Sequence, residues 1–243
     1  MKIIDSTIDQ EEIKKFEQIA LEWWDTGGKF KPLHYLNPIR LEFIRDHIES
    51  NYPNILKSNI RVIDIGCGGG IVSEPLSNMG YDVTGIDASE INISSAKVHA
   101  EKSNSSAKYF CSSAEKFAGQ KKKFDVVVAL EIIEHVNNIP LFLDSLAKLL
   151  KPGGLMFIST INKNLKSYLS AIIVAEYVLR MLPVGTHSFD KFVKPSTIIN
   201  ILTDKNILPI SLKGLKYNML SNRWRLSTSA DVNYIMALSR RNP

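Results

Sequence analysis

Several features that would set this chain apart from ordinary globular proteins are missing. Only two cysteines occur, Cys67 and Cys111, and neither has the spacing of a zinc site or of a disulfide framework, so a reducing compartment is expected. Residues 1–5 contain no apolar run of the kind that begins a secretory signal. Internal repeats and low-complexity runs are absent too. These absences favour a cytoplasmic globular protein.

A run of about 20 uncharged apolar residues, the length that spans a bilayer, is also missing. The nearest approach is the apolar segment 165–182, which Lys166, Glu176 and Arg180 interrupt. Such a helix suits a membrane interface, where Lys166 and Arg180 would reach the headgroups. The alternative is a helix inserted over the sheet edge and buried in protein.

Acidic residues are scarce in the last third of the chain. Residues 165–243 hold 11 Lys/Arg against 4 Asp/Glu, a surplus of +7 in a chain whose net charge is +5. This surplus favours an anionic partner, either a membrane surface or nucleic acid, although lysines that are merely solvated would give the same count. Aromatic and basic residues do not interleave as they do where bases stack, so we expect no nucleic acid.

The pattern of strand-like and helix-like segments predicts an α/β fold. From Arg61 onward, strand-like and helix-like segments alternate, as in a doubly wound, mostly parallel seven-stranded sheet with helices on both faces. The predicted strands are 61–65, 82–87, 107–111, 124–130, 154–160, 208–217 and 231–239; the predicted helices are 9–25, 39–50, 70–79, 89–103, 138–150 and 165–182. We expect one domain of 243 residues, divided into a helical cover (1–58), a core (61–160), an apolar insertion (163–195) and C-terminal strands (196–243).

The most informative stretch is VIDIGCGGG at 62–70. A buried strand ends in Asp64, and four glycines follow within five residues before a helix begins. Glycines let a ligand approach the main chain, and the helix N-terminus offers free N–H groups. Asp87 ends the next strand, at the spacing where a carboxylate meets a ribose.

Two ligands would use this arrangement, a dinucleotide or S-adenosylmethionine. The dinucleotide fingerprint needs glycine at its first, third and sixth positions, which here are Gly66, Gly68 and Ile71. The missing third glycine favours S-adenosylmethionine, because that ligand has no pyrophosphate. The Asp64-x-Gly66-x-Gly68 pattern resembles motif I of class I methyltransferases.

The exit of the predicted strand 124–130 is the candidate catalytic region. If 131–135 turns helically, Glu131, Glu134 and His135 lie on one side, where they would hold a divalent cation such as Mg²⁺ or act as acid and base. The simpler alternative is that both carboxylates cap a helix and His135 only packs. The loop 113–115 is a candidate adenine contact or a helix cap. His187 is a weaker catalytic candidate.

Further stretches are distinctive along most of the chain: KFE at 15–17, WWD at 23–25, FKPLH at 30–34, LNPIR at 36–40, EIIEHV at 131–136, EYVLR at 176–180, GTH at 185–187 and DVNY at 231–234. On these residues the chain resembles the ubiquinone biosynthesis O-methyltransferase family. The resemblance implies S-adenosylmethionine-dependent methylation of hydroxyls on polyprenylated catechol or phenol intermediates, namely 2-polyprenyl-6-hydroxyphenol and 3-demethylubiquinol.

The resemblance also implies roles for individual residues. Arg40, Gly66, Asp87 and Leu130 would contact S-adenosylmethionine, and a divalent cation would sit at Glu131, Glu134 and His135. The segment matching 165–182 would dock the protein on the inner face of the membrane, where a polyprenylated substrate resides, and a complex with other enzymes of ubiquinone biosynthesis is expected. Methylation of another small phenol, or of RNA, is the alternative function.

Overall fold

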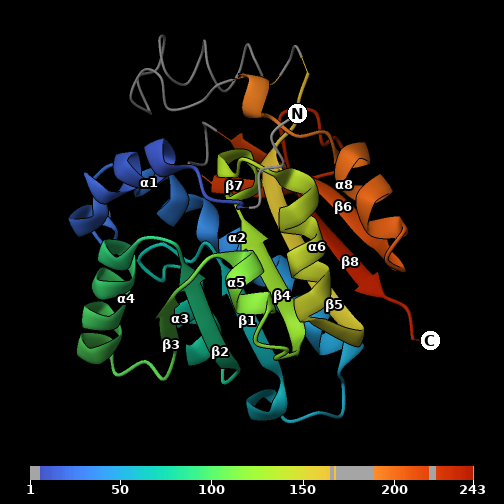
Figure 1. The fold of residues 1–243 in the computed structure, drawn as a ribbon, viewed down its shortest axis with the longest axis horizontal. Helices are drawn as coiled ribbons and strands as arrows, with labels where there is room; N and C mark the ends of the chain where they lie inside the picture. Colours follow the sequence, from blue (N-terminus) through green and yellow to red (C-terminus); the bar gives the residue numbers. More distant parts are fainter. Residues whose placement is uncertain (1–5, 165–166, 168–188, 219–222, 243) are drawn as a thin grey trace.

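The computed structural model describes residues 6–164, 167, 189–218 and 223–242, and one mixed sheet forms its centre (Figure 1). The strand order is β3-β2-β1-β4-β5-β8-β6-β7. The strands are β1 (Arg61–Ile65), β2 (Asp82–Asp87), β3 (Lys108–Cys111), β4 (Phe124–Leu130), β5 (Leu150–Ile161), β6 (Ile207–Asn218), β7 (Arg223–Ser227) and β8 (Asn233–Arg240). Strands β1 to β5 run parallel to one another, whereas β8 lies antiparallel between β5 and β6. The predicted α/β class is confirmed, with eight strands in place of seven because β7 pairs with β6 as an edge hairpin.

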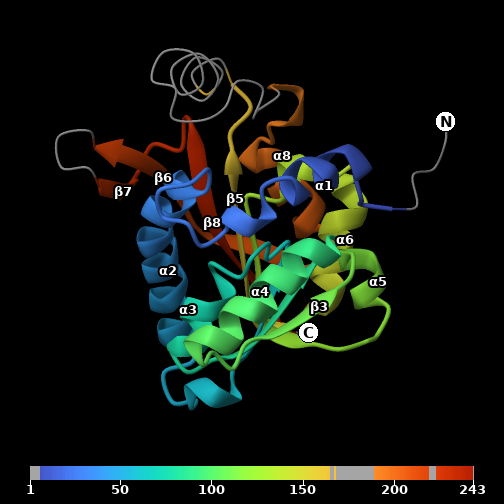
Figure 2. The same cartoon turned by 90° about the vertical axis from the view of Figure 1, so that its left-hand side faces the viewer.

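Helices cover both faces of the sheet, as Figure 2 shows in a view turned by 90°. They are α1 (Gln10–Glu17), α2 (Lys31–Asn51), α3 (Ser73–Asn78), α4 (Glu90–Ser103), α5 (Ala114–Ala118), α6 (Ile139–Leu149) and α8 (Pro195–Thr203). Strand β4 contributes apolar side chains to both faces of the sheet. Val126 and Val128 belong to the apolar cluster shared with α2 and α3, whereas Val127 and Ala129 belong to the cluster shared with α6. A strand buried on both faces therefore reads as a continuous apolar run.

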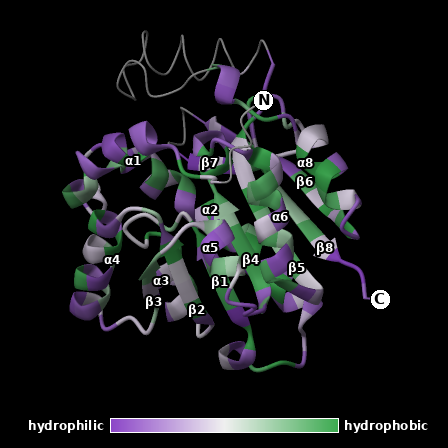
Figure 3. Ribbon diagram, viewed as in Figure 1, coloured by the Kyte–Doolittle hydropathy of each residue, from purple (hydrophilic) through white to green (hydrophobic). Residues whose placement is uncertain are grey.

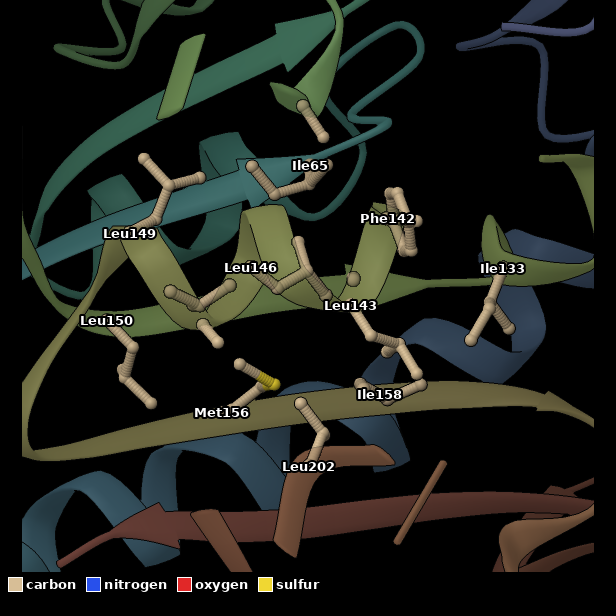
Figure 4. Close-up of a cluster of buried hydrophobic side chains, with 14 of the residues drawn as sticks. Ile65, Ile133, Phe142, Leu143, Leu146, Leu149, Leu150, Met156, Ile158 and Leu202 are labelled. Carbon is tan, nitrogen blue, oxygen red and sulfur yellow. The ribbon is translucent and has the colours of Figure 1, made fainter. Parts of the chain in front are cut away.

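The core between the sheet and α6 is well filled. Leu143 and Leu146 of α6 point toward Ile158 and Met156 of β5, and Leu202 of α8 closes the far side (Figure 4). Figure 3 shows the same division by hydropathy, with apolar residues along the strands and polar residues on the outer helices. This rigid packing fixes the strand ends that carry the site.

The N-terminal region differs most from the prediction. The predicted helix 9–25 is wrong in length: α1 begins after its cap Asp9 and ends at Glu17, and a short 3₁₀ turn follows at Ala20–Glu22. The helix predicted at 39–50 begins earlier than expected, because α2 begins at Lys31. Pro32 lies in the first turn of α2, where proline is tolerated, whereas Pro38 lies in the interior of the same helix.

The order in which successive parallel strands are added to the sheet reverses at β1. Strands β2 and β3 lie on one side of β1, and β4 and β5 lie on the other. In sheets of this kind the crevice at the reversal, outside the carboxyl ends of the strands, is where ligands bind. The loops after β1, β2 and β4 therefore form the candidate site.

None of the helices in the described ranges is long and apolar enough to cross a membrane. The predicted interfacial segment 165–182, apart from Ser167, and His187 lie outside the described residues.

Candidate active site

The turn after β1 brings bare main chain to the carboxyl edge of the sheet. Gly66 and Gly68 have φ values of 73° and 53°, which side chains rarely adopt. A Cβ atom on Gly66 would lie 2.6 Å from Ile132, and one on Gly68 would lie 2.4 Å from Trp23. Both backbone angle and packing therefore require glycine at these two positions.

Asp87, at the end of β2, lies against this turn. Its Oδ2 accepts a hydrogen bond from the Gly68 N–H at 3.0 Å, and its Oδ1 accepts bonds from the Ser89 N–H at 2.8 Å and from Asn92 Nδ2 at 3.2 Å. Burial raises the pKa of Asp87, while these donors oppose the rise. The carboxylate is fixed in orientation, as the spacing from the glycines predicts.

Two tryptophans from the N-terminal region cover the turn from the other side. Trp23 is buried, stacks on Phe30 with ring centroids 3.7 Å apart, and donates from Nε1 to Asn92 Oδ1 at 2.9 Å. Trp24 donates from Nε1 to the Gly69 carbonyl at 2.8 Å. The pair both anchors the cover and closes the site.

These elements line a cavity that is open to solvent, with about 770 Å³ of unfilled space when the open part is included. Its walls come from the strand exits and from the N-terminal segment, whose helix α1 lies above α4 in Figure 1. The lining residues that matter below are Glu12, Phe16, Trp23, Gly66, Gly68, Asp87, Ser113, Glu131 and His135.

Arg40 is a fully buried cation beneath the glycine turn. Its side chain is 2% exposed, and its Nε has no hydrogen-bond partner among the described residues. Nη2 donates to Asn37 at 3.1 Å, and Nη1 lies 3.8 Å from a carboxylate oxygen of Glu131. Burial lowers the pKa of Arg40, and Glu131 and Asp64 oppose that shift. Arg40 is not among the residues that line the cavity, but it lies beside Glu131, which is. A buried guanidinium with an unused donor at that place is suited to an anionic ligand.

The exit of β4 bends sharply after the buried Leu130. Glu131 has a φ of 52°, and its Oε1 accepts a hydrogen bond from Ser159 Oγ at 2.5 Å. Leu130 packs with the cluster under α2 and is not among the residues that line the cavity. Glu131 therefore faces Arg40 and the cavity on a fixed main chain.

Glu134 is placed differently from its neighbours. It is 5% exposed, and its Oε2 has no hydrogen-bond partner among the described residues. Burial raises the pKa of Glu134, and the nearby Glu131 adds to the rise. It does not line the cavity, so the structure does not place it on a ligand.

His135 does line the cavity. Its Nδ1 lies 2.8 Å from Oε2 of Glu12, and Phe16 meets its ring edge-on at 5.1 Å. Burial disfavours the charged imidazole, but the bond to Glu12 together with the negative charges of Glu134 and Glu12 outweighs that effect, so the pKa of His135 is raised. Among the predicted catalytic residues that the structure describes, His135 is the one that carries a basic side chain and lines the cavity.

The predicted convergence of Glu131, Glu134 and His135 is not what the structure shows. The three follow one another through a 3₁₀ turn (Ile133–His135), and each side chain has different surroundings. Across the described residues, no group of three or more His, Cys, Asp or Glu side chains is arranged to hold a metal ion. The donor set predicted for Mg²⁺ therefore does not fit a metal in this arrangement.

In the loop after β3 the helix-cap role is confirmed for Ser113, and the adenine contact stays a prediction. Ser113 caps α5 by accepting from the Lys116 N–H at 3.4 Å, and it also lines the cavity. Glu115 turns away and accepts from Thr7 Oγ1 at 2.6 Å, so it holds the N-terminal segment and is not a cavity residue.

Glu12 and Asn92 are site residues that sequence reasoning missed. Glu12 follows the helix cap Asp9 by three residues, a spacing that is typical of a capping box and indicates nothing about a cavity. Asn92 follows Ser89 by three residues inside a helix, and nothing in that spacing indicates contact with Asp87. Both residues act through partners that are brought close only by the tertiary fold.

The fold and the site together define a methyltransferase domain. Residues 35–207 match the family model described as "Methyltransferase domain". The fold resembles the plantazolicin methyltransferase BpumL (19% identity, TM-score 0.65, 96% of this chain and 99% of that one). It also resembles the magnesium protoporphyrin IX methyltransferase of Synechocystis PCC 6803, solved with bound SAH (19% identity, TM-score 0.57, 97% and 90% covered).

More similar relatives specify the family within that class. The ubiquinone biosynthesis O-methyltransferase of Pelagibacter ubique (strain HTCC1062) is 48% identical over 235 residues, which cover 95% of this chain and 97% of the relative. That of Rickettsia prowazekii (strain Madrid E) is 45% identical, with 97% and 92% covered. The chain belongs to the ubiquinone biosynthesis O-methyltransferase family, and the family resemblance of its sequence is confirmed.

Proposed function

We propose that the protein transfers a methyl group from S-adenosylmethionine to a ring hydroxyl of polyprenylated catechol or phenol intermediates, namely 2-polyprenyl-6-hydroxyphenol and 3-demethylubiquinol. One observation carries the proposal: a single cavity is lined by the glycine turn, by Asp87 and by His135. A nucleoside site and a base thus share one space, which is what transfer between two bound molecules requires. The names of the relatives supply the substrate class.

The residues present fit the methyl donor. Among the described residues, Oδ2 of Asp87 accepts one hydrogen bond, so it retains acceptor capacity for a ribose hydroxyl. Arg40 has a buried Nε with no partner among the described residues, which suits the carboxylate of the methionine moiety. Leu130 ends β4 and belongs to the apolar cluster that includes residues of α2, so its contact with the donor stays a prediction.

The chemistry divides between donor and protein. When bound, S-adenosylmethionine supplies a methyl group already activated by its sulfonium. A phenol with a pKa near 10 is a poor nucleophile at neutral pH, so the protein must remove its proton. His135 is the group at the cavity wall that takes this proton. Glu131, held by Ser159 and facing Arg40, keeps the neighbouring charge balanced.

A divalent cation at Glu131, Glu134 and His135 stays a prediction of the family resemblance. We derive no step through it, because the three side chains do not converge here. Removing divalent cations with EDTA should leave methyl transfer intact if His135 alone activates the acceptor. A loss of turnover that Mg²⁺ restores would show that the metal mechanism operates.

We also propose that the protein works on the inner face of the membrane, where its substrate resides. Residues 205–230 contain five Lys/Arg and no Asp/Glu. On the β6–β7 hairpin, Lys216 lies directly across from Arg225, with Arg223 two residues along, and all three side chains are exposed. Like charges paired across strands are destabilising on their own, and an anionic headgroup surface offsets that repulsion.

Vesicle flotation tests the membrane proposal. The double variant K216E/R225E should lose binding to vesicles that contain phosphatidylglycerol, and binding of the parent protein should weaken with salt. The matched control is K97E/K102E, which makes the same charge change on the exposed side of α4. If both double variants float equally, the β6–β7 hairpin does not mediate membrane binding. Association with other enzymes of ubiquinone biosynthesis stays a prediction.

A methyl-transfer assay on a short-chain demethylubiquinol, read by mass spectrometry, tests the activity. Methylated product should form with S-adenosylmethionine, and H135Q should reduce turnover by about 100-fold or more. The control is H47Q, because His47 bonds the Phe43 carbonyl of its own helix at 2.8 Å. Transfer to a simple catechol but not to the quinol would contradict the substrate class, and no transfer to either would contradict the function.

A further inference from the structure

A carboxylate from the far N-terminus reaches the candidate base. Glu12 on α1 and His135 after β4 are 123 residues apart in the chain, yet Oε2 of Glu12 lies 2.8 Å from Nδ1 of His135. Both residues line the cavity, and Glu12 is 7% exposed. The contact is therefore inside the site and not on the surface of the molecule.

The two oxygens of Glu12 are divided between different partners. Oε1 accepts from Lys15 Nζ at 2.8 Å and from Lys191 Nζ at 2.9 Å, so it is occupied by two lysines. Lys191 also pairs with Asp9, the cap of α1, at 3.2 Å. Oε2 is thus the oxygen that meets the imidazole. The lysine bonds fix the carboxylate where it is.

This arrangement determines which nitrogen of the ring carries the proton. An ionised carboxylate only accepts hydrogen bonds, so Nδ1 must donate, and the lone pair of the neutral ring then resides on Nε2. The edge-on ring of Phe16, at an interplanar angle of 89°, restricts rotation of the imidazole. Nε2 is the nitrogen left to act on a bound acceptor.

We propose that Glu12 is the positioning residue of His135, which selects the tautomer and ring orientation in which Nε2 receives the acceptor proton. The inference rests on the proposed function of His135 as base. In this role Glu12 touches neither donor nor acceptor. It makes α1 a part of the catalytic apparatus, because the base is correctly set only while α1 is docked.

The competing explanation is that Glu12 merely fastens the N-terminal segment. That segment has other fastenings, among them the bond from Asn137 Nδ2 to the Ile8 carbonyl at 2.7 Å. The variant N137A loosens the segment without touching the ring of His135. The variant E11Q removes a neighbouring exposed carboxylate on the same helix and serves as the neutral control.

Two measurements on E12A, E12Q, E11Q and N137A decide between the explanations. We expect E12A to lower kcat by about 10- to 100-fold, with KM for S-adenosylmethionine within twofold of the parent. E12Q, which keeps an acceptor oxygen, should fall between. Ring ¹⁵N spectra at alkaline pH, with the His135 signal identified by its loss in H135Q, should show the proton on Nδ1 in the parent and on Nε2 to a growing extent in E12A.

Several results would overturn the inference. One is a kcat of E12A within twofold of the parent, and another is a parent ring with its proton on Nε2. Equal losses of activity in E12A and N137A, with an unchanged tautomer, would show that Glu12 is only a fastening. If the parent transfers no methyl group, the proposed function fails, and the spectra then report separately whether Glu12 sets the tautomer.

Discussion

Replacing Asp87 by asparagine tests the assignment of the methyl-donor site. The carboxylate has about four acceptor positions, and three are used by the N–H groups of Gly68 and Ser89 and by Asn92. The remaining position, on Oδ2, is the one available to a ribose hydroxyl. In D87N an NH₂ group takes the place of one oxygen, and it faces a donor wherever it turns. The ribose bond is then lost or misdirected.

The size of the effect follows from the kind of bond. A hydrogen bond to a charged group contributes about 1.5–3 kcal/mol. Since each 1.4 kcal/mol is tenfold in affinity, S-adenosylmethionine should bind D87N about 10- to 150-fold more weakly. D87N should also lose folding stability on the order of 1–3 kcal/mol, because one of the N–H groups that face residue 87 is left without an acceptor.

Isothermal titration calorimetry with S-adenosylmethionine measures the affinity, and thermal denaturation measures the stability. The matched control is D82N, the same substitution at the opposite end of β2, where the half-exposed side chain pairs with Lys108 at 2.9 Å. We expect D82N to bind within twofold of the parent. If folded D87N also binds within twofold, Asp87 does not hold the ribose, and the site assignment is wrong.

Three further perturbations test the rest of the site. G68A should weaken donor binding at least tenfold and lower Tm, because the new Cβ meets Trp23 at 2.4 Å on a backbone of positive φ; normal calorimetry and Tm would refute the packing argument. R40M should weaken donor binding about tenfold or more and should also lower Tm, since Glu131 and the buried Asp64 lose their positive partner; unchanged binding by the folded variant would contradict its role. Burial raises the pKa of Asp64 to about 6 from 3.8, so its carboxyl group stays protonated up to a higher pH in the folded state than in the unfolded state. Stability should therefore fall as pH rises through this window, by up to about 3 kcal/mol, and urea titrations should show a flatter pH profile for D64N.

The sequence predicts best where local chemistry determines structure. The strands 61–65, 82–87 and 124–130 are confirmed with the same first and last residues. The run at 124–130 is almost entirely apolar, and glycines mark the turns beside the other two strands. The position of Asp87 beside the glycine turn also follows from spacing alone. The helical cover is predicted less well, since the helix predicted at 39–50 begins at Lys31, in a stretch that contains two prolines. Its helix is stabilised by burial against the sheet, which is a tertiary effect.

The catalytic region shows the same limit more sharply. A helical reading of 131–135 predicts three side chains on one side, but Glu131 adopts a left-handed φ and a 3₁₀ turn follows. That backbone sends Glu131 toward Ser159 and His135 toward the N-terminal segment. Neither partner is near in sequence, so periodicity could not indicate the separation.

The glycines after β1 have a second requirement that the cofactor alone does not explain. A Cβ on either Gly68 or Gly69 would lie 2.4 Å from Trp23, so these two positions make room for the cover as well as for a ligand. The cover in turn carries Glu12, which meets the candidate base. Close approach of Trp23 to bare main chain is therefore a condition for seating α1, and seating α1 is a condition for orienting His135. The glycine turn and the base, which belong to different strands, are coupled through the N-terminal segment.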